Sequence, residues 1–177
     1  MNPTQLSHEL RQSTTPHMQR RRWIIGLSLL GTAMGQIVSL YQTGIIKDLP
    51  DPPIGPFDSA RVDASNYAYK RFETPDALMM IVNYGLTAWL AGAGGKGRVE
   101  TQPLLPVAMA LKTLIDSGTA VKLGFEEWGE NKALCVYCQV ATVASLASVA
   151  LAVPEALEGL RNLIGDKRGT PIAMMAR

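Results

Sequence analysis

Three long stretches of the sequence contain no charged residue. They cover residues 23–46, 77–95 and 133–154. Each is close to the roughly 20 residues that an α-helix needs to cross about 30 Å of hydrocarbon. A helix of a soluble protein rarely stays uncharged over such a length, because its outer face must meet water. The sequence therefore predicts helices that span a membrane.

A fourth apolar stretch, residues 103–125, contains Lys112, Asp116 and Lys122. Lys112 and Asp116 are four residues apart, so they share a helix face and can pair. A paired charge that faces a bundle interior is tolerated in a membrane, and Lys122 can extend from the helix end to the interface. We therefore predict an all-α membrane protein in contact with lipid, a four-transmembrane-helix bundle with spans at about 23–46, 75–95, 103–125 and 133–153.

The distribution of basic residues predicts the orientation of these spans. Basic residues lie before the first span, between the second and third, and after the fourth: Arg20, Arg21, Arg22, Lys96, Arg98, Arg161, Lys167 and Arg168. Cytoplasmic loops of membrane proteins carry an excess of lysine and arginine, so both termini are predicted to lie in the cytoplasm. In a bacterium, the membrane would be the inner membrane. The loop after the first span and residues 126–130 after the third span are both net acidic. They then face the periplasm, where disulfides can persist. The net charge of +2 is explained by topology and gives no indication of nucleic-acid binding.

A cleaved signal peptide is the alternative interpretation of residues 20–46. The apolar run is too long for one and no clear A-x-A site follows, which favours a retained helix. Residues 1–19 are polar and are predicted to form a flexible cytoplasmic tail. Pro154 is expected to end the fourth helix or start a new one. Leu157, Leu160 and Ile164 then predict a short interfacial helix within a cytoplasmic segment, residues 156–177.

The first outer loop contains four prolines between residues 50 and 56, which force an extended path. Beyond them, Val62, Tyr69 and Phe72 fall on one face of a helical projection, with Asp63 and Lys70 elsewhere. The pattern predicts one short amphipathic helix, with the three apolar residues facing the bundle or bilayer and the two charged residues facing outward.

Cys135 and Cys138 are the only cysteines, and they open the fourth span. A structural zinc site needs four ligands, and His8 and His17 belong to the tail across the membrane, so we predict no metal. Covalent haem attachment needs a histidine where Gln139 stands. At the first turn of a helix, backbone N–H groups stabilise a thiolate, and a spacing of three allows a disulfide. A redox dithiol is therefore favoured over two small buried hydrophobes.

The segment EEWGENKALCVYCQVATVASLASVAL, residues 126–151, resembles the vitamin K epoxide reductase family of four-helix membrane thiol:quinone oxidoreductases. The segments TPDALMMIVNYGLTAWLAG and LPVAMALKTLIDSGTAVKLGFEEW resemble its second and third helices, so the likeness covers about residues 20–155. It implies that Cys138 exchanges electrons with a quinone of menaquinone, ubiquinone or phylloquinone type. It also implies that Cys135 exchanges with the thiols of a partner, such as a periplasmic thioredoxin-like protein.

The sequence departs from this family at two places. Fully active members carry a second cysteine pair in the first outer loop, but residues 47–76 contain none. Thr142 also stands where some members have a quinone-contacting tyrosine. These departures leave open an alternative function, that of a non-catalytic structural subunit of a larger membrane complex.

Four polar residues within the spans are candidates for contact with the quinone. Asp76, Asn83 and Thr142 could bind its carbonyl oxygens, or could serve as caps and helix–helix hydrogen bonds. Asp116 could exchange a proton during quinone chemistry, or could form only a structural pair with Lys112.

Overall fold

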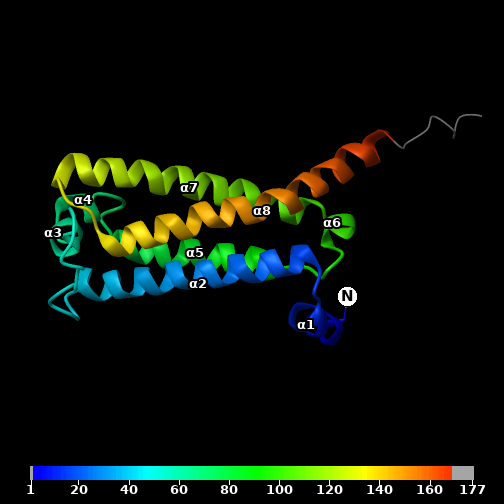
Figure 1. Ribbon diagram of the computed structural model, residues 1–177, viewed down its shortest axis with the longest axis horizontal. Helices are drawn as coiled ribbons and strands as arrows, with labels where there is room; N and C mark the ends of the chain where they lie inside the picture. The colour runs from blue at the N-terminus through cyan, green and yellow to red at the C-terminus, as the bar shows by residue number, and fades with distance from the viewer. Residues whose placement is uncertain (1, 169–177) are drawn as a thin grey trace, which may run out of the picture.

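The computed structural model describes residues 2–168 and is built from helices (Figure 1). In chain order these are α1 (Pro3–Gln12), α2 (Pro16–Gln42), α3 (Ser59–Asp63), α4 (Asn66–Tyr69), α5 (Asp76–Gly92), α6 (Arg98–Thr101), α7 (Leu104–Asn131) and α8 (Val136–Arg168). Apart from an isolated bridge between Phe57 and Leu134, the described residues contain no strand. The predicted all-α fold is confirmed.

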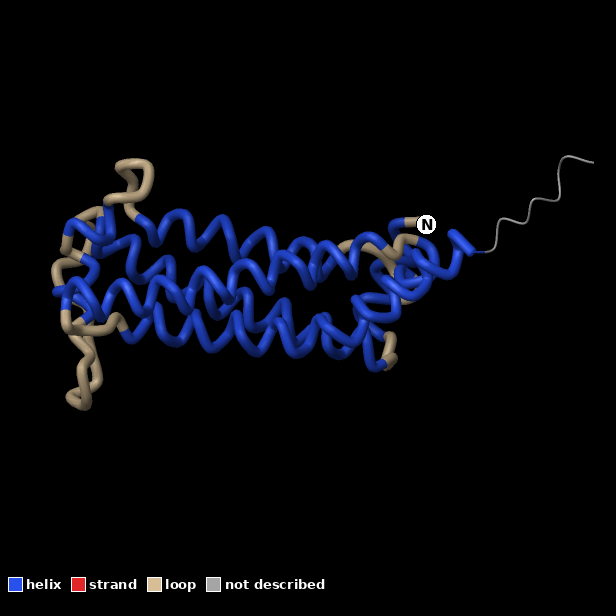
Figure 2. The backbone as a smooth tube through the Cα atoms, turned by 90° about the horizontal axis from the view of Figure 1, so that it is seen from above, coloured by secondary structure: helices blue, strands red, loops and turns tan. Residues whose placement is uncertain are grey.

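The four long helices α2, α5, α7 and α8 lie side by side, and the loops gather at the two ends (Figures 1 and 2). Within residues 2–168, three helices are long and apolar enough to cross a membrane, namely Pro16–Gln42, Leu104–Asn131 and Val136–Gly165. Helix α5 has 17 residues, which corresponds to about 26 Å at 1.5 Å per residue. It is shorter than the other three, and its role as the fourth span stays a prediction.

Two glycines let α2 and α5 approach closely. A Cβ atom at Gly31 would lie 2.6 Å from the ring of Tyr84, and one at Gly35 would lie 3.1 Å from Ile81. Small residues four apart serve this purpose in membrane helices. The close approach brings Tyr84 of α5 to the interior, where its hydroxyl donates to the Ala141 carbonyl of α8 at 2.5 Å.

The N-terminal region is more ordered than its polar sequence indicated. Residues 3–12 form α1 where we predicted a flexible tail over residues 1–19, and α2 covers 16–42 instead of 23–46. The Asn2 side chain accepts the Thr4 N–H at 3.1 Å, and Pro3 stands at the first helical position, so the helix start is well capped. Glu9 then accepts the Lys96 N–H at 2.9 Å and ties α1 to the loop after α5.

Helix α8 continues through Pro154 to Arg168, so the predicted break and the separate interfacial helix are wrong for the described residues. A proline inside a helix removes one backbone hydrogen bond. Contacts with α6 hold the segment beyond it: Glu155 pairs with Arg98, and the Asn162 side-chain amide donates to the Val99 carbonyl at 3.0 Å. Gly159 also packs so tightly that a Cβ would lie 2.9 Å from the Pro103 carbonyl oxygen.

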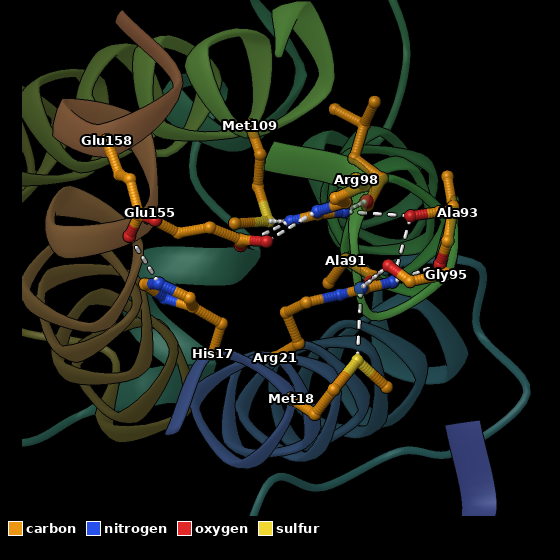
Figure 3. Close-up of polar contacts among 12 residues, drawn as sticks. His17, Met18, Arg21, Ala91, Ala93, Gly95, Arg98, Met109, Glu155 and Glu158 are labelled. Carbon is orange, nitrogen blue, oxygen red and sulfur yellow. Dashed lines mark hydrogen bonds and ion pairs between the residues drawn. The ribbon is translucent and has the colours of Figure 1, made fainter. Parts of the chain in front are cut away.

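Two arginines close the end of the bundle opposite the cysteines (Figure 3). Arg21 of α2 donates to four backbone carbonyl oxygens at the end of α5, at 2.7 to 3.0 Å. One belongs to the last turn of α5 and three to the residues that follow: Ala91, then Ala93, Gly94 and Gly95. Arg98 has no exposed surface and forms a two-pronged pair with Glu155 of α8 at 2.7 and 2.6 Å. The two residues that the sequence assigned only to topology therefore also join α2, α5, α6 and α8.

The first outer loop contains two short helices instead of one. The chain breaks between α3 and α4, and Phe72 adopts a left-handed conformation with φ of 55°. Val62 faces inward as predicted and Lys70 is exposed as predicted. Phe72, predicted to face the bundle or the bilayer, is 85% exposed and so does not face the bundle, and its contact with the bilayer stays a prediction. Asp63, predicted to face outward, is 2% exposed, so that prediction is wrong. The break rotates the second half of the segment relative to the first, which a single helical projection could not represent.

Candidate functional site

The two cysteines lie where the chain enters α8. Cys135 immediately precedes the helix and Cys138 lies in its first turn. The Cys138 N–H points at the Cys135 sulfur, at 3.3 Å, and both residues are free thiols. A carboxylate oxygen of Glu127, on α7, accepts the Cys135 N–H, and the other accepts from Gln139 at 3.4 Å. The two cysteines therefore lie close together and Glu127 fixes the start of α8, while the redox role of the pair stays a prediction.

The first outer loop covers Cys135. Asp51 accepts both the N–H and the hydroxyl of Ser59, at 2.6 and 2.5 Å. The Ser59 hydroxyl in turn accepts the Val136 N–H at 3.0 Å, and the Tyr137 hydroxyl donates to the Pro50 carbonyl at 2.7 Å. These contacts hold α3 across the start of α8, and we refer to Asp51, Ser59 and Val136 as the loop latch.

The loop changes the expected accessibility of the two sulfurs. Cys135 is fully buried, in a cluster with Val38, Val62 and Tyr67. The resemblance implies that Cys135 exchanges with the thiols of a partner, but in this conformation its side chain is not accessible to one. Cys138, one helical turn further in, is only half-buried.

Cys138 faces a cavity of about 370 Å³ inside the bundle. Its walls come from α2, the loop helices, α5, α7 and α8, and include Val38, Met79, Met80, Leu123 and Ala141. A mostly apolar cavity of this size with a few polar groups is typical of small-molecule sites. All four polar residues singled out from the sequence, Asp76, Asn83, Asp116 and Thr142, line the same cavity.

Each of those four residues also takes part in a structural bond. Asp76 accepts from Gln42 at 2.8 Å, and Thr142 donates to the Cys138 carbonyl at 2.9 Å. The predicted pair between Lys112 and Asp116 is present. The Lys112 ammonium also donates to the Asn83 side chain at 3.0 Å. Asp76, Asn83 and Asp116 thus form the structural contacts that the sequence left open, whereas Thr142 donates within its own helix. All four also line the cavity, so contact with a quinone stays a prediction.

Asp63 is the cavity residue that sequence reasoning missed most clearly. One of its carboxylate oxygens is buried and has no hydrogen-bond partner. A carboxylate oxygen and the sulfurs of Cys135 and Cys138 all lie within 4.8 Å of one another. Burial raises the pKa of Asp63 from its ordinary 3.8 to about 7. No signal in the sequence marked it, because the helical projection placed it on the polar face.

Carboxylate and thiolate are both zinc ligands, but these three groups are one fewer than the four that a structural zinc site needs. The absence of a metal therefore stays a prediction.

Arg71 is a second residue that the sequence did not single out. Its Nη2 donates to Glu126 of α7 at 3.0 Å, and its guanidinium lies 4.8 Å from the centre of the Tyr67 ring. Its Nη1 is buried without a hydrogen-bond partner, 3.7 Å from a carboxylate oxygen of Asp76. Because Arg71 lines the cavity, it offers an unused cationic donor there.

Over the described residues, an all-helical fold with membrane-length helices, and two free cysteines at the edge of an apolar cavity, define the class of membrane protein. The model of the vitamin K epoxide reductase family matches residues 22–153, and the chain belongs to that family. Comparison with curated proteins and with solved structures found no match.

Proposed function

We propose that the chain is a membrane thiol:quinone oxidoreductase. In this reaction the Cys135–Cys138 pair interconverts between dithiol and disulfide and exchanges two electrons and two protons with a membrane quinone. The same pair links this exchange to disulfide formation in a partner protein. The observation that carries the proposal is the position of Cys138, whose side chain lines the apolar cavity while Cys135 lies behind it under the loop.

The residues of the cavity fit an apolar ring that carries oxygen acceptors. When bound, a quinone supplies a two-electron, two-proton acceptor. Met79, Met80 and Leu123 would enclose its ring, and the free Nη1 of Arg71 would donate to an oxygen atom. Asn83 and Thr142 line the same space, but the Asn83 side-chain oxygen and the Thr142 hydroxyl already take part in other bonds.

The partner that we propose is a periplasmic thioredoxin-like protein. Thiol–disulfide exchange proceeds through attack of a thiolate on a disulfide sulfur, so the partner must reach a cysteine directly. Since the loop has no cysteines to relay electrons and Cys135 is covered, we expect the loop latch to open for this step.

The same observation favours a second candidate function. A buried Cys135 under a cysteine-free loop also suits a family-derived structural subunit of a larger membrane complex, in which the pair has lost its redox role.

Two cysteine variants distinguish these functions. Purified wild-type protein should reduce a quinone when given a thiol reductant, and Cys138→Ala should not. Cys135→Ala should keep a Cys138 thiol that reacts with quinone but does not pass electrons to a partner. In native membranes, Cys138→Ala should trap the partner as a mixed disulfide on non-reducing electrophoresis, because no resolving thiol remains. Wild-type turnover in both variants without trapping would instead support the structural subunit.

We also propose four spans in a bacterial inner membrane, with both termini in the cytoplasm, on the basis of the basic residues beside α2, α6 and α8. Reporter fusions after Arg177 and within residues 61–70 should report opposite sides of the membrane. The same side for both fusions would contradict this topology.

A further inference from the structure

The environment of Asp63 differs from that of the other carboxylates in the cavity. Asp76 accepts from Gln42, Asp116 pairs with Lys112, and both oxygens of Glu127 are engaged by Cys135 and Gln139. Asp63 is 2% exposed and keeps an oxygen that is buried and unpartnered. Buried polar groups in native proteins are nearly always satisfied, so a buried oxygen without a partner calls for an explanation.

The position of Asp63 supplies that explanation. Its carboxylate lies within 4.8 Å of both sulfurs, and it lines the cavity that Cys138 faces. Cys135 has no exposed surface. Bulk water therefore does not contact its thiol and does not accept the proton that the thiol must lose when it forms a disulfide. Among the described residues, Asp63 is the carboxylate found in one cluster with the two sulfurs.

We propose that Asp63 is the proton acceptor for the Cys135 thiol when the Cys135–Cys138 disulfide closes. In this step the S–H bond of Cys135 breaks and its proton moves to the Asp63 carboxylate. The Cys135 sulfur bonds to the Cys138 sulfur, and the bond from Cys138 to the departing oxidant breaks with its electron pair. The two cysteines lose two electrons and the oxidant gains them. The oxidant is a quinone if the proposed function holds, and an aromatic disulfide serves equally well as a test.

The charges around Asp63 suit a group that alternates between carboxylate and carboxylic acid. Several titratable groups surround Asp63, whereas α2 contributes Val38 to the cavity. They are Asp51 and Arg71 from the loop, Tyr69 from α4, Asp76 from α5, Glu127 from α7, Cys135 before α8, and Tyr137 and Cys138 of α8. Burial and the neighbouring Asp76 and Asp51 raise the pKa of Asp63 to about 7. A proton acceptor is most effective when its pKa lies near the working pH.

A neutral aromatic disulfide, 4,4′-dithiodipyridine, separates the closing step from quinone chemistry. Reaction with reduced protein releases one coloured thiopyridone when Cys138 is modified and a second when Cys135 closes the disulfide. Cys135→Ala should give only the first phase. Asp63→Asn should slow the second phase about 100-fold at pH 8, the order of magnitude of a lost proton acceptor. The wild-type second phase should fall as the pH drops through about 7, and the variant should lose this dependence.

Three further variants keep the test decisive. Asp58→Asn changes an exposed carboxylate that caps the same helix and should leave both phases unchanged. Glu127→Gln should keep the inflection near pH 7, because its oxygens are already engaged. Asp63→Glu, which retains a carboxylate, should recover part of the rate and the pH dependence.

An unchanged second phase in Asp63→Asn, or a slow second phase without pH dependence in Asp63→Glu, would overturn the inference. A normal closing step in a protein that never reduces quinone would contradict only the proposed function.

Discussion

A carboxylate oxygen of Glu127, in the last turns of α7, accepts the backbone N–H of Cys135 at the start of α8. The first N–H groups of a helix have no partner within that helix, so a buried helix start needs an acceptor from elsewhere. Glu127 is 3% exposed and supplies it. The reactive end of α8 is thus fixed by the neighbouring helix.

Removal of this acceptor should loosen the cysteine pair. Glu127→Ala leaves the Cys135 N–H buried without a partner, which costs about 1–3 kcal/mol. We expect a lower unfolding temperature in detergent and a less uniform reaction of Cys138 with a thiol reagent. Glu127→Gln keeps an oxygen acceptor and should lie close to wild type. The matched control is Glu130→Ala on the same helix, whose side chain is 48% exposed; an equal loss in both alanine variants would contradict the capping role.

The loop latch should control access to Cys135. Asp51→Ala removes the charged acceptor of two hydrogen bonds that Ser59 donates. Each such bond contributes about 1.5–3 kcal/mol, and about 1.4 kcal/mol changes an opening equilibrium tenfold. We therefore expect N-ethylmaleimide to label Cys135 at least about tenfold faster in the variant, as followed by mass spectrometry. Asp48→Ala, an exposed residue of the same loop, is the control, and equal labelling rates in the two variants would show that other contacts hold the loop.

The three helices long and apolar enough to cross a membrane, α2, α7 and α8, were predictable from the sequence because their signal is local. A run of uncharged residues predicts a span whatever its neighbours are, and the spacing of Lys112 and Asp116 predicts their pairing. The Cys-x-x-Cys pair could also be recognised from the sequence, since its two residues are only three positions apart. These features needed no knowledge of long-range contacts.

The features that the sequence did not predict depend on contacts between distant segments. Asp63 turns inward because α3 ends at this residue and the loop latch holds α3 against α8. Helix α8 continues beyond Pro154 because Arg98 and Val99, more than 50 residues away, hold the segment that follows. No periodicity within the loop or within α8 contains that information.

The pair of Arg98 with Glu155 should contribute far more to stability than an exposed ion pair. Glu155→Gln would leave Arg98 buried and uncompensated, and breaking one side of a buried pair costs about 3–5 kcal/mol. Glu130→Gln breaks an ion pair with Lys70 in which both side chains are more than 40% exposed, and such pairs contribute at most about 1 kcal/mol. Thermal unfolding of both variants in one detergent tests the contrast, and similar unfolding temperatures would contradict it.

Arg71 should contribute to quinone binding through its free Nη1. Arg71→Gln removes the charged donor, whose hydrogen bond is worth about 1.5–3 kcal/mol, so we expect the KM for quinone to rise roughly 10- to 100-fold. The control is Arg61→Gln, an exposed residue of α3, which should leave KM unchanged. A drop in turnover number without any change in KM would mean that Arg71 acts elsewhere than on the bound quinone.

The raised pKa of Asp63 also has a consequence for stability. Between its ordinary value of 3.8 and about 7, the folded protein holds a proton that the unfolded chain has released. Stability must therefore fall as the pH rises through this window, and stay constant above it. Asp63→Asn cannot ionise and should escape the loss, so its unfolding temperature should exceed that of wild type by a margin that grows from pH 4 to pH 7 and then levels off. Thermal unfolding of both proteins at pH 4.5, 6 and 8 measures this margin, with Asp58→Asn as the exposed control. A constant margin over the three pH values would show that Asp63 keeps an ordinary pKa in the folded protein.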